Sequence, residues 1–251
     1  MKREYEELYH RLETRQWWFR TRREIVRDLV LETHPDRTGR ILEIGCSGGL
    51  LMEQLRADGY RQVTGIDLSA DAVDLCRRKG IPDAHVMDAQ QPAFADAQFE
   101  VITASDVLEH LADEAGALRE WFRILKPGGV LIVFVPAFQL LWSEHDEANK
   151  HFRRYRRAEL RDRLAAQGFR VERASYWNVA LFPAVALVRL ARRARPHNER
   201  AAQEGDLFEP PRLVNMTLTG LLRIENWVMR RGVNFPFGVS AMAVARKPAQ
   251  P

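Results

Sequence analysis

The chain has 251 residues, of which 46% are hydrophobic and 29% are charged. This balance is typical of a folded globular protein and excludes intrinsic disorder, a collagen-like fibre and a disulfide scaffold. The net charge of +4 is too small to indicate nucleic-acid binding by itself. Two cysteines, Cys46 and Cys76, are expected to be buried thiols of a reducing compartment. Because no signal-peptide region and no stretch near the roughly 20 residues that span a bilayer is visible, the sequence predicts a cytoplasmic protein.

Short apolar segments alternate with helical patterns between residues 40 and 136. Ser69 is a suitable N-cap for one helix, Gly80 is a suitable stop, and the turn 126–129 (Lys-Pro-Gly-Gly) is expected to end another. The alternation predicts βαβ units and a parallel sheet covered by helices on both faces. The predicted strands are 40–44, 63–67, 85–88, 99–105 and 130–135, and the predicted helices are 50–57, 69–79 and 112–125.

The pattern changes after Pro136. Residues 137–157 show neither helical nor strand periodicity, and a predicted helix at 158–167 and a strand at 169–176 follow. Two apolar and basic helices, joined by a polar link that contains proline, then precede a last predicted strand at 239–245.

The strongest chemical signal is the glycine-rich segment after the first predicted strand, Glu43-Ile44-Gly45-Cys46-Ser47-Gly48-Gly49. Glycines let the backbone turn tightly and approach a ligand closely. Asp67 follows Gly45 by 22 residues, at the end of the second predicted strand, where a carboxylate can accept hydrogen bonds from both ribose hydroxyls of an adenosine. The combination favours an adenosine-containing cofactor over a turn that binds nothing.

The charge of Glu43 discriminates between two such cofactors. A dinucleotide site requires G-x-G-x-x-G next to a pyrophosphate, which a neighbouring carboxylate would repel. Here Ser47 stands at the second glycine position, and Glu43 would attract the ammonium group of an amino-acid cofactor. The sequence therefore favours S-adenosylmethionine over NAD.

From about residue 40 to 136, and again in the last strand, the sequence resembles the class I S-adenosylmethionine-dependent methyltransferases. In that family the first strand ends in an acidic residue followed by G-x-G-x-G, and Ser47 here replaces the middle glycine. The resemblance implies an α/β fold with a Rossmann-like, doubly wound, seven-stranded sheet whose last strand is antiparallel. The expected parts are an N-terminal helical lid over 1–38, a core over 39–177 and 236–248, and a helical cap inserted at 178–235.

The resemblance also implies cofactor contacts. Asp67 would hold the ribose, Leu68 would form a wall of the adenine pocket, and Asp88 would accept from the adenine amino group. A W-F-x-x-R segment similar to Trp18–Arg22 opens this group of proteins as a lid, although an amphipathic helix docked on the sheet explains its aromatic residues equally well. The complete predicted cofactor set is Arg22, Glu43, Gly45, Cys46, Ser47, Gly49, Asp67, Leu68, Asp88, Ala89 and Ser105.

Two polar clusters are predicted to face the methyl acceptor. In the segment 105–111, His110 could remove a proton from an acceptor hydroxyl, or Glu109 and His110 could merely cap the next helix. The spacing of Asp106, Glu109 and His110 resembles an E-x-x-E-H arrangement that helps to hold a divalent cation in ubiquinone-biosynthesis O-methyltransferases. Because aspartate replaces the first glutamate, a metal ranks below both alternatives, and the prediction contains no metal.

The second cluster lies in the aperiodic segment after the fifth strand. His145 is an alternative base, and Arg153 or Arg154 could clamp a carboxylate or phosphate through the planar guanidinium. The arginines that follow, from residue 156 to 163, are explained by an exposed helix start. The predicted substrate-binding residues are His151, Arg153, Arg154 and Tyr155.

The insertion contains ten apolar residues, 179–188, followed by Arg189, Arg192, Arg193 and Arg195. A cap that closes the acceptor pocket is the favoured interpretation, and a peripheral membrane contact through 179–195, at the inner face of the membrane, is the alternative. Either one suggests an acceptor with apolar surface.

The sequence therefore predicts an enzyme that transfers a methyl group from S-adenosylmethionine to a hydroxyl or carboxylate of a small, partly apolar or lipid-linked metabolite. The alternatives are an NAD-dependent oxidoreductase and a non-catalytic module that binds an adenosine cofactor. A nucleic-acid substrate is disfavoured because the arginines form no continuous stripe and no N-P-P-[YF] motif follows the fourth strand.

Overall fold

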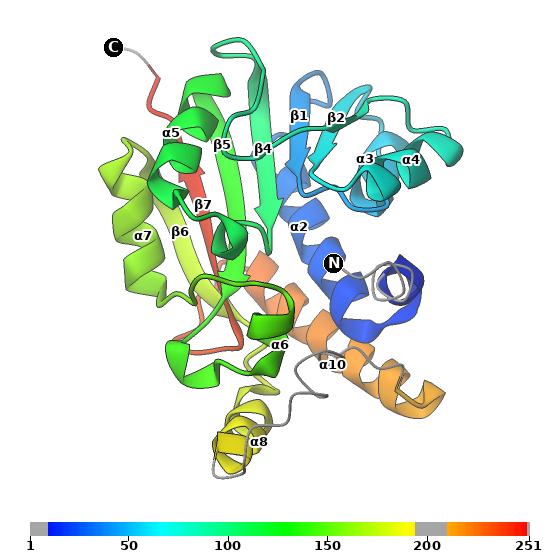
Figure 1. Cartoon of the computed structure of the whole chain (residues 1–251), viewed down its shortest axis with the longest axis vertical. Coiled ribbons are helices and arrows are strands. Elements are labelled where there is room, and N and C mark those ends of the chain that lie inside the picture. The colour runs from blue at the N-terminus through cyan, green and yellow to red at the C-terminus, as the bar shows by residue number, and fades with distance from the viewer. Residues whose placement is uncertain (1–9, 194–209, 250–251) are drawn as a thin grey trace.

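The computed structural model describes residues 10–193 and 210–249. At its centre is a seven-stranded sheet in the order β3-β2-β1-β4-β5-β7-β6 (Figure 1). β7 runs antiparallel to β5 and β6, and the other pairs are parallel. The predicted doubly wound fold with an antiparallel last strand is confirmed. The strands are β1 (Arg40–Ile44), β2 (Gln62–Asp67), β3 (Ala84–Val86), β4 (Phe99–Ser105), β5 (Leu125–Pro136), β6 (Arg170–Trp177) and β7 (Ser240–Arg246).

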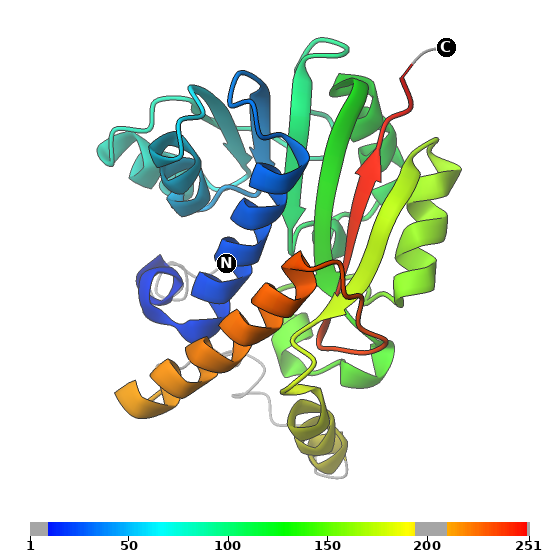
Figure 2. The ribbon, with the colours of Figure 1, turned by 180° about the vertical axis from the view of Figure 1, so that it is seen from behind.

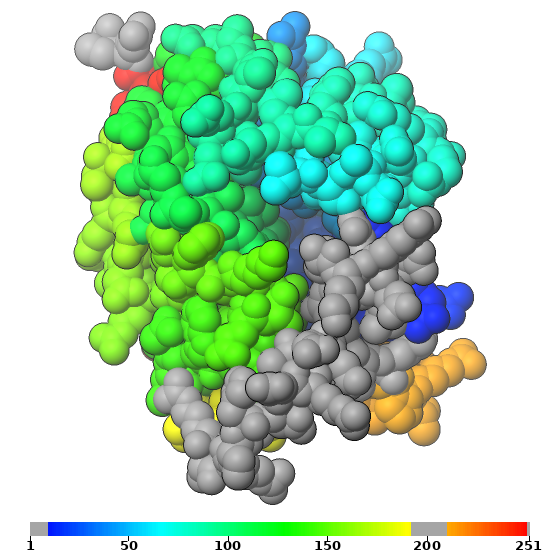
Figure 3. Space-filling model, in the orientation of Figure 1, coloured from blue at the N-terminus to red at the C-terminus, as the bar shows by residue number. Residues whose placement is uncertain are grey.

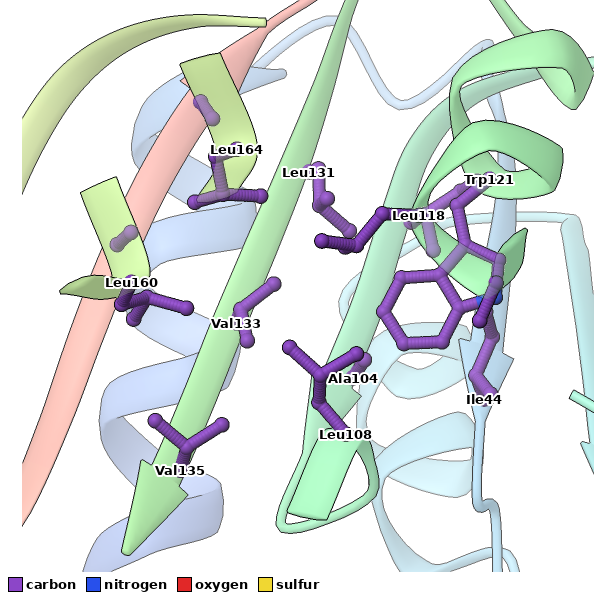
Figure 4. Close-up of a cluster of buried hydrophobic side chains, with 14 of the residues drawn as sticks. Ile44, Ala104, Leu108, Leu118, Trp121, Leu131, Val133, Val135, Leu160 and Leu164 are labelled. Atoms are coloured by element: carbon purple, nitrogen blue, oxygen red, sulfur yellow. The ribbon is translucent and has the colours of Figure 1, made fainter. Parts of the chain in front are cut away.

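Helices cover both faces of this sheet (Figures 1 and 2). On one face, α5 (Glu114–Ile124) and α7 (Arg157–Ala166) bury Trp121 and Leu164 against Leu131 and Val133 of β5, as Figure 4 shows. The other face carries α2 (Trp17–Thr33), α3 (Leu50–Ala57), α4 (Ala70–Arg78) and α10 (Arg212–Arg230). The strands are apolar on both sides because both sides are buried, as expected for a sheet between two helical layers.

Two local predictions were wrong. The segment 126–129 is not a turn that ends a helix: α5 stops at Ile124, and these residues already belong to β5. Gly128 and Gly129 instead exchange backbone hydrogen bonds of 2.9 Å with Lys247, just after β7. The segment expected to be aperiodic also contains a 3-10 turn, η2 (Gln139–Leu141), and a helix, α6 (Glu144–Ala148). These elements are too short to produce a visible hydrophobic period.

The insertion between β6 and β7 contains α8 (Phe182–Arg193) and α10. Arg195 and the polar link between the two helices lie outside the described residues, as do the side chains of Arg192 and Arg193. Among the helices that are described, none has both the length and the apolar character needed to cross a bilayer.

Buried polar groups attach α10 to the rest of the fold. Asn226 accepts from Trp177 Nε1 at 2.8 Å and donates to the backbone oxygen of Thr21 at 2.9 Å, so it joins β6 to α2. The neighbouring Glu225 accepts from the backbone N–H groups of Asn178 and Val179 at 2.5 and 2.9 Å. These bonds leave only the outer side of α10 exposed to solvent.

We expect Asn226→Ala to lower the free energy of unfolding by about 1–3 kcal/mol, because it leaves the buried Trp177 Nε1–H without a partner and removes the link between β6 and α2. Urea denaturation followed by circular dichroism measures this loss. Arg161→Ala on the exposed side of α7 is the control and should change the stability by less than about 0.5 kcal/mol. A loss for Asn226→Ala that is no larger than that of the control would contradict the bridging role.

Candidate functional site

The turn between β1 and α3 has left-handed backbone at three positions, with φ of 73° at Gly45, 46° at Ser47 and 74° at Gly49. A Cβ atom on Gly45 would lie 2.6 Å from Cγ2 of Val107, and one on Gly49 would lie 2.9 Å from Sγ of Cys76. Both positions therefore require glycine, whereas the middle position accommodates a serine in the same left-handed conformation. The turn leads directly into α3, as the glycine pattern predicts.

Asp67 connects this turn to the end of β2. Its carboxylate accepts from the backbone N–H of Ser47 and from that of Ser69, each at 2.9 Å. Gly45 and Cys46 add hydrogen bonds from their own N–H groups to the oxygen of Ile66, at 2.8 and 3.0 Å. The carboxylate is thus oriented at the carboxyl edge of the sheet, where ligands of such folds bind.

A cleft opens next to the turn, and Glu43 forms part of its wall together with Glu13, Cys46 and Ser47. Figure 3 shows a hollow between the cyan surface around α4 and the green surface of the loops after β5, with α2 in blue at its base. The Oε2 atom of Glu43 is buried and has no hydrogen-bond partner among the described residues. Burial, reinforced by the Glu13 carboxylate, raises the pKa of Glu43 well above its usual range. Arg23, which also lines the cleft, lowers the pKa of this carboxyl, but the effect of burial is larger.

Arg22 lies on the same cleft and belongs to α2. Its guanidinium is enclosed by the rings of Trp18, Phe134 and Trp177, whose centroids lie 5.0, 4.3 and 4.2 Å away. One of its nitrogens donates to Ser240 Oγ at 2.5 Å, whereas Nε and Nη1 are buried without a partner in the described part of the chain. A cleft that contains both an unsatisfied carboxylate and unsatisfied guanidinium N–H groups is suited to a zwitterion.

The predicted adenine contacts lie at the ends of β2 and β3. Leu68 is 77% exposed, so its side chain is available as a wall. Asp88 is also exposed and accepts from the backbone N–H of Gln90 at 2.8 Å. The carbonyl of Ala89 accepts from Trp121 Nε1 at 2.8 Å, which attaches this loop to α5.

Three ionisable groups gather where the acceptor is predicted to bind. One ligand atom from each of Glu109, His110 and His151 lies within 4.8 Å of the others. Glu109 is fully buried with neither oxygen hydrogen-bonded within the described ranges, and burial, with the nearby Asp106, raises the pKa of Glu109 well above its usual range. The sequence spacing groups Asp106 with Glu109 and His110, whereas the structure brings His151 to Glu109 and His110.

His110 is neutral at physiological pH. Although the residue as a whole is exposed, the groups packed around its ring desolvate it, and this desolvation is the main reason that the pKa of His110 is lowered to about 4. The rings of His110 and His151 pack edge to face with centroids 4.5 Å apart. The ring centroids of His145, on α6, and His151 are 6.1 Å apart.

Asp146 organises the loop that carries these histidines. It is completely buried and accepts from His151 Nδ1 at 2.8 Å and from Arg154 Nε and Nη2 at 2.8 and 2.9 Å. Burial alone would raise the pKa of Asp146, but the hydrogen bonds from His151 and Arg154 outweigh it and hold that pKa below its usual range. The guanidinium of Arg154 therefore faces Asp146, and His151 presents its other nitrogen, Nε2.

The two remaining predicted substrate residues are attached to α5. Tyr155 is only 1% exposed, and its hydroxyl donates to Glu114 Oε2 at 2.7 Å, so it offers no open surface for a substrate contact. Arg153 lies 3.1 Å from the same carboxylate and donates to the oxygen of Ala112. Both residues hold the loop against the core, which the sequence pattern alone did not reveal.

Comparisons with known proteins agree with this geometry. Residues 18–174 match the sequence profile of a family described as a methyltransferase domain. This match covers more than half of the chain. The chain belongs to the class I S-adenosylmethionine-dependent methyltransferases.

Similar curated proteins carry the name ubiquinone biosynthesis O-methyltransferase. The protein from Xanthomonas oryzae is 35% identical over 100 residues, which are 38% of this chain and 41% of the relative. The one from Stutzerimonas stutzeri is 33% identical over 134 residues, or 50% of this chain and 57% of the relative. The methyltransferase thus spans about half the length of the curated relatives it matches.

Solved structures show the same fold at lower identity. Phosphoethanolamine N-methyltransferase 2 of Haemonchus contortus, in complex with S-adenosyl-L-methionine, is 20% identical with a TM-score of 0.55, covering 87% of this chain and 51% of that one. A methyltransferase of Mesorhizobium loti is 16% identical with a TM-score of 0.55, and the match covers 83% of this chain and 90% of that one. The cyclase SpnF is 23% identical with a TM-score of 0.59, covering 90% and 80%. The fold of the methyltransferase therefore also occurs in a protein named for a different reaction.

Sequence reasoning missed the contacts that the N-terminal residues make with the glycine turn. The hydroxyl of Ser47 donates to Glu13 Oε2 at 3.0 Å and lies 3.2 Å from His10 Nδ1. A glycine at this position could make neither contact. The replacement of the middle glycine by serine was visible in the sequence, but its partners 34 and 37 residues away were not.

We expect Asp67→Ala to weaken S-adenosylmethionine binding by at least about tenfold, since it removes a charged acceptor and releases two loop amides. Isothermal titration calorimetry measures the dissociation constant. Asp71→Ala, on the exposed side of α4, is the control and should bind as the wild type does. An unchanged dissociation constant for Asp67→Ala would refute the predicted ribose contact.

Ser47→Gly should increase the dissociation rate of the cofactor about three- to tenfold, because it removes the hydroxyl that holds Glu13 over the turn. Stopped-flow displacement measures this rate, and hydrogen exchange at residues 10–15 should increase in parallel. Ser47→Ala removes the hydroxyl but keeps the Cβ atom, so it separates the loss of the hydrogen bond from a change in backbone conformation. If only the glycine variant accelerates release, the effect comes from backbone conformation and not from the hydroxyl.

Proposed function

We propose that this protein transfers the methyl group of S-adenosylmethionine to an oxygen atom, a hydroxyl or a carboxylate, of a small, partly apolar or lipid-linked acceptor. The observation that carries the proposal is the cleft in which Glu43 and Arg22 both have unsatisfied buried atoms. Glu43 would pair with the ammonium group of the cofactor and Arg22 with its carboxylate. Asp67 would accept from the ribose hydroxyls, with Leu68 and Asp88 at the adenine.

When bound, the cofactor supplies a methyl group that is already activated for an in-line displacement. The protein residues then need only to align the acceptor and to exclude water. Trp18 and Phe19 line the cleft beside Arg22 and would close it against solvent. Ser105, at the end of β4, lies on the same cleft and would adjoin the methionine portion.

An oxygen acceptor must lose a proton, and three histidines are close enough to share this task. His110 is neutral and can accept the proton. The hydrogen bond from His151 Nδ1 to Asp146 orients the His151 ring and leaves Nε2 as an acceptor, an arrangement that prepares a general base. His145 is the third candidate, from α6.

Glu109, His110 and His151 offer a second role as a group. A carboxylate oxygen and two imidazole nitrogens within 4.8 Å have the composition of a divalent metal site, and Asp146 would supply the outer hydrogen bond to His151. A cation bound there would lower the pKa of an acceptor hydroxyl. The prediction without a metal and this alternative are distinguished by the turnover of enzyme treated with EDTA.

Two other functions are weaker. The family membership and the carboxylate of Glu43 argue against NAD, whose pyrophosphate it would repel. A non-catalytic module would need no cluster of histidines beside the cleft. The name O-methyltransferase of the curated relatives supports oxygen as the acceptor atom.

Transfer of a labelled methyl group to phenolic, carboxylic or lipid-linked acceptors tests the proposal. His110→Ala should lower kcat by about a hundredfold while leaving the cofactor dissociation constant unchanged. Because the pKa of His110 is about 4, its protonation should reduce kcat only as the pH falls toward 4, rather than near 6.5. His85→Ala, on the exposed β3, is the matched control. Equal loss of turnover and of cofactor affinity would indicate a structural role for His110.

A further inference from the structure

The exposed side of α10 is apolar, which is unusual for a surface helix. One side of the helix is buried with Leu222, Asn226 and Met229. On the opposite side, an apolar stripe recurs at helical spacing, and its members are 55–78% exposed: Leu213, Met216, Ile224 and Trp227. A helix face in contact with water normally carries polar residues. The exposed apolar stripe therefore indicates a surface that binds another molecule.

A basic cleft adjoins the first turn of this helix. Three of the residues that line it are arginines, Arg15, Arg20 and Arg212, and no acidic residue is among the lining residues within 10–193 and 210–249. Asn215 joins its two walls, because its side chain accepts from the backbone N–H of Trp17 at 2.8 Å and donates to the oxygen of Arg15 at 2.9 Å. Positive charge is thus held beside Met216, the residue that belongs to both the cleft and the stripe.

The exposed side of α10 itself carries no acidic residue. The single acidic residue of the helix, Glu225, is buried under it. Arg223 and Arg230 pair with Glu24 and Asp28 of α2. Arg231, just after the helix, lies over the Trp227 ring, 3.2 Å from its centroid. The apolar stripe is therefore bordered by arginines at both ends.

We propose that the stripe and the arginine-lined cleft form a docking surface for an anionic phospholipid bilayer. The apolar side chains would enter the interfacial region, and the arginines would pair with the lipid phosphates. Charge complementarity favours this occupant over a second copy of the chain, because two such faces would bring arginine-rich ends together.

The surface lies on the second helix of the insertion, whose stretch 213–231 repeats the apolar and basic composition of the membrane contact that the sequence predicted through 179–195. That contact rests on α8, which exposes Leu187 and Leu190. The helices α8 and α10 lie at the same end of the molecule (Figure 1). Docking through α10 does not depend on methyl transfer. Only its use, to bring the active site to a lipid-linked acceptor, rests on the proposed function.

Flotation with vesicles tests the docking surface. The intact chain should bind vesicles that contain phosphatidylglycerol and should bind vesicles of phosphatidylcholine alone much more weakly. Ile224→Glu should lower the bound fraction about tenfold or more, since it puts a charge into the apolar stripe. Arg212→Glu should do the same only for anionic vesicles. Arg161→Glu, on α7 on the opposite face of the sheet, is the control for charge reversal and should bind normally.

Each alternative outcome overturns the proposal. Equal binding of both vesicle types would remove the role of the arginines, and normal binding by Ile224→Glu would remove the role of the stripe. Release by inorganic phosphate without effect of Ile224→Glu would identify a site for a soluble anion. Light scattering that finds a dimer, made monomeric by Ile224→Glu, would show that a second copy covers the face. Cofactor affinity measured on the same variants shows that they are folded.

Discussion

The carboxylate of Asp67 is the interaction on which the site depends. By accepting the amides of Ser47 and Ser69, it joins the turn after β1 to the turn after β2. The turn after β1 has three left-handed residues, so it cannot take this shape without glycine at two of them. A negative group at the sheet edge therefore holds together the backbone that a nucleoside would contact.

Electrostatic imbalance, rather than shape alone, defines the cleft. Glu43 and Arg22 are both buried with unsatisfied atoms, a condition that costs free energy in the protein without a ligand. A ligand with both an ammonium and a carboxylate group would relieve both. The aromatic rings around Arg22 come from α2, β5 and β6, so this charge is positioned by three parts of the chain.

The predicted acceptor side is organised by Asp146, which is buried and holds His151 and Arg154. Several polar residues that a sequence pattern assigns to substrate, such as Tyr155, instead stabilise the loop that carries the histidines. The same fold occurs in a cyclase and in methyltransferases, so the fold by itself does not determine the reaction.

The sequence by itself determined the fold class, most element positions and the cofactor turn. Alternation of apolar strands with helices is a local signal, and β1, β4 and α3 were predicted with the bounds that the structure has. The glycine positions were equally readable, because left-handed backbone restricts residue type locally.

Contacts between distant segments were decided only by the tertiary structure. Nothing in the sequence near Glu109 shows that His151 lies beside it, that Ser47 contacts Glu13, or that α10 exposes its apolar side while burying Glu225. The direction of each side chain depends on how the elements pack, and packing is a property of the whole chain. Local sequence patterns therefore cannot predict a role that requires two distant segments to come into contact.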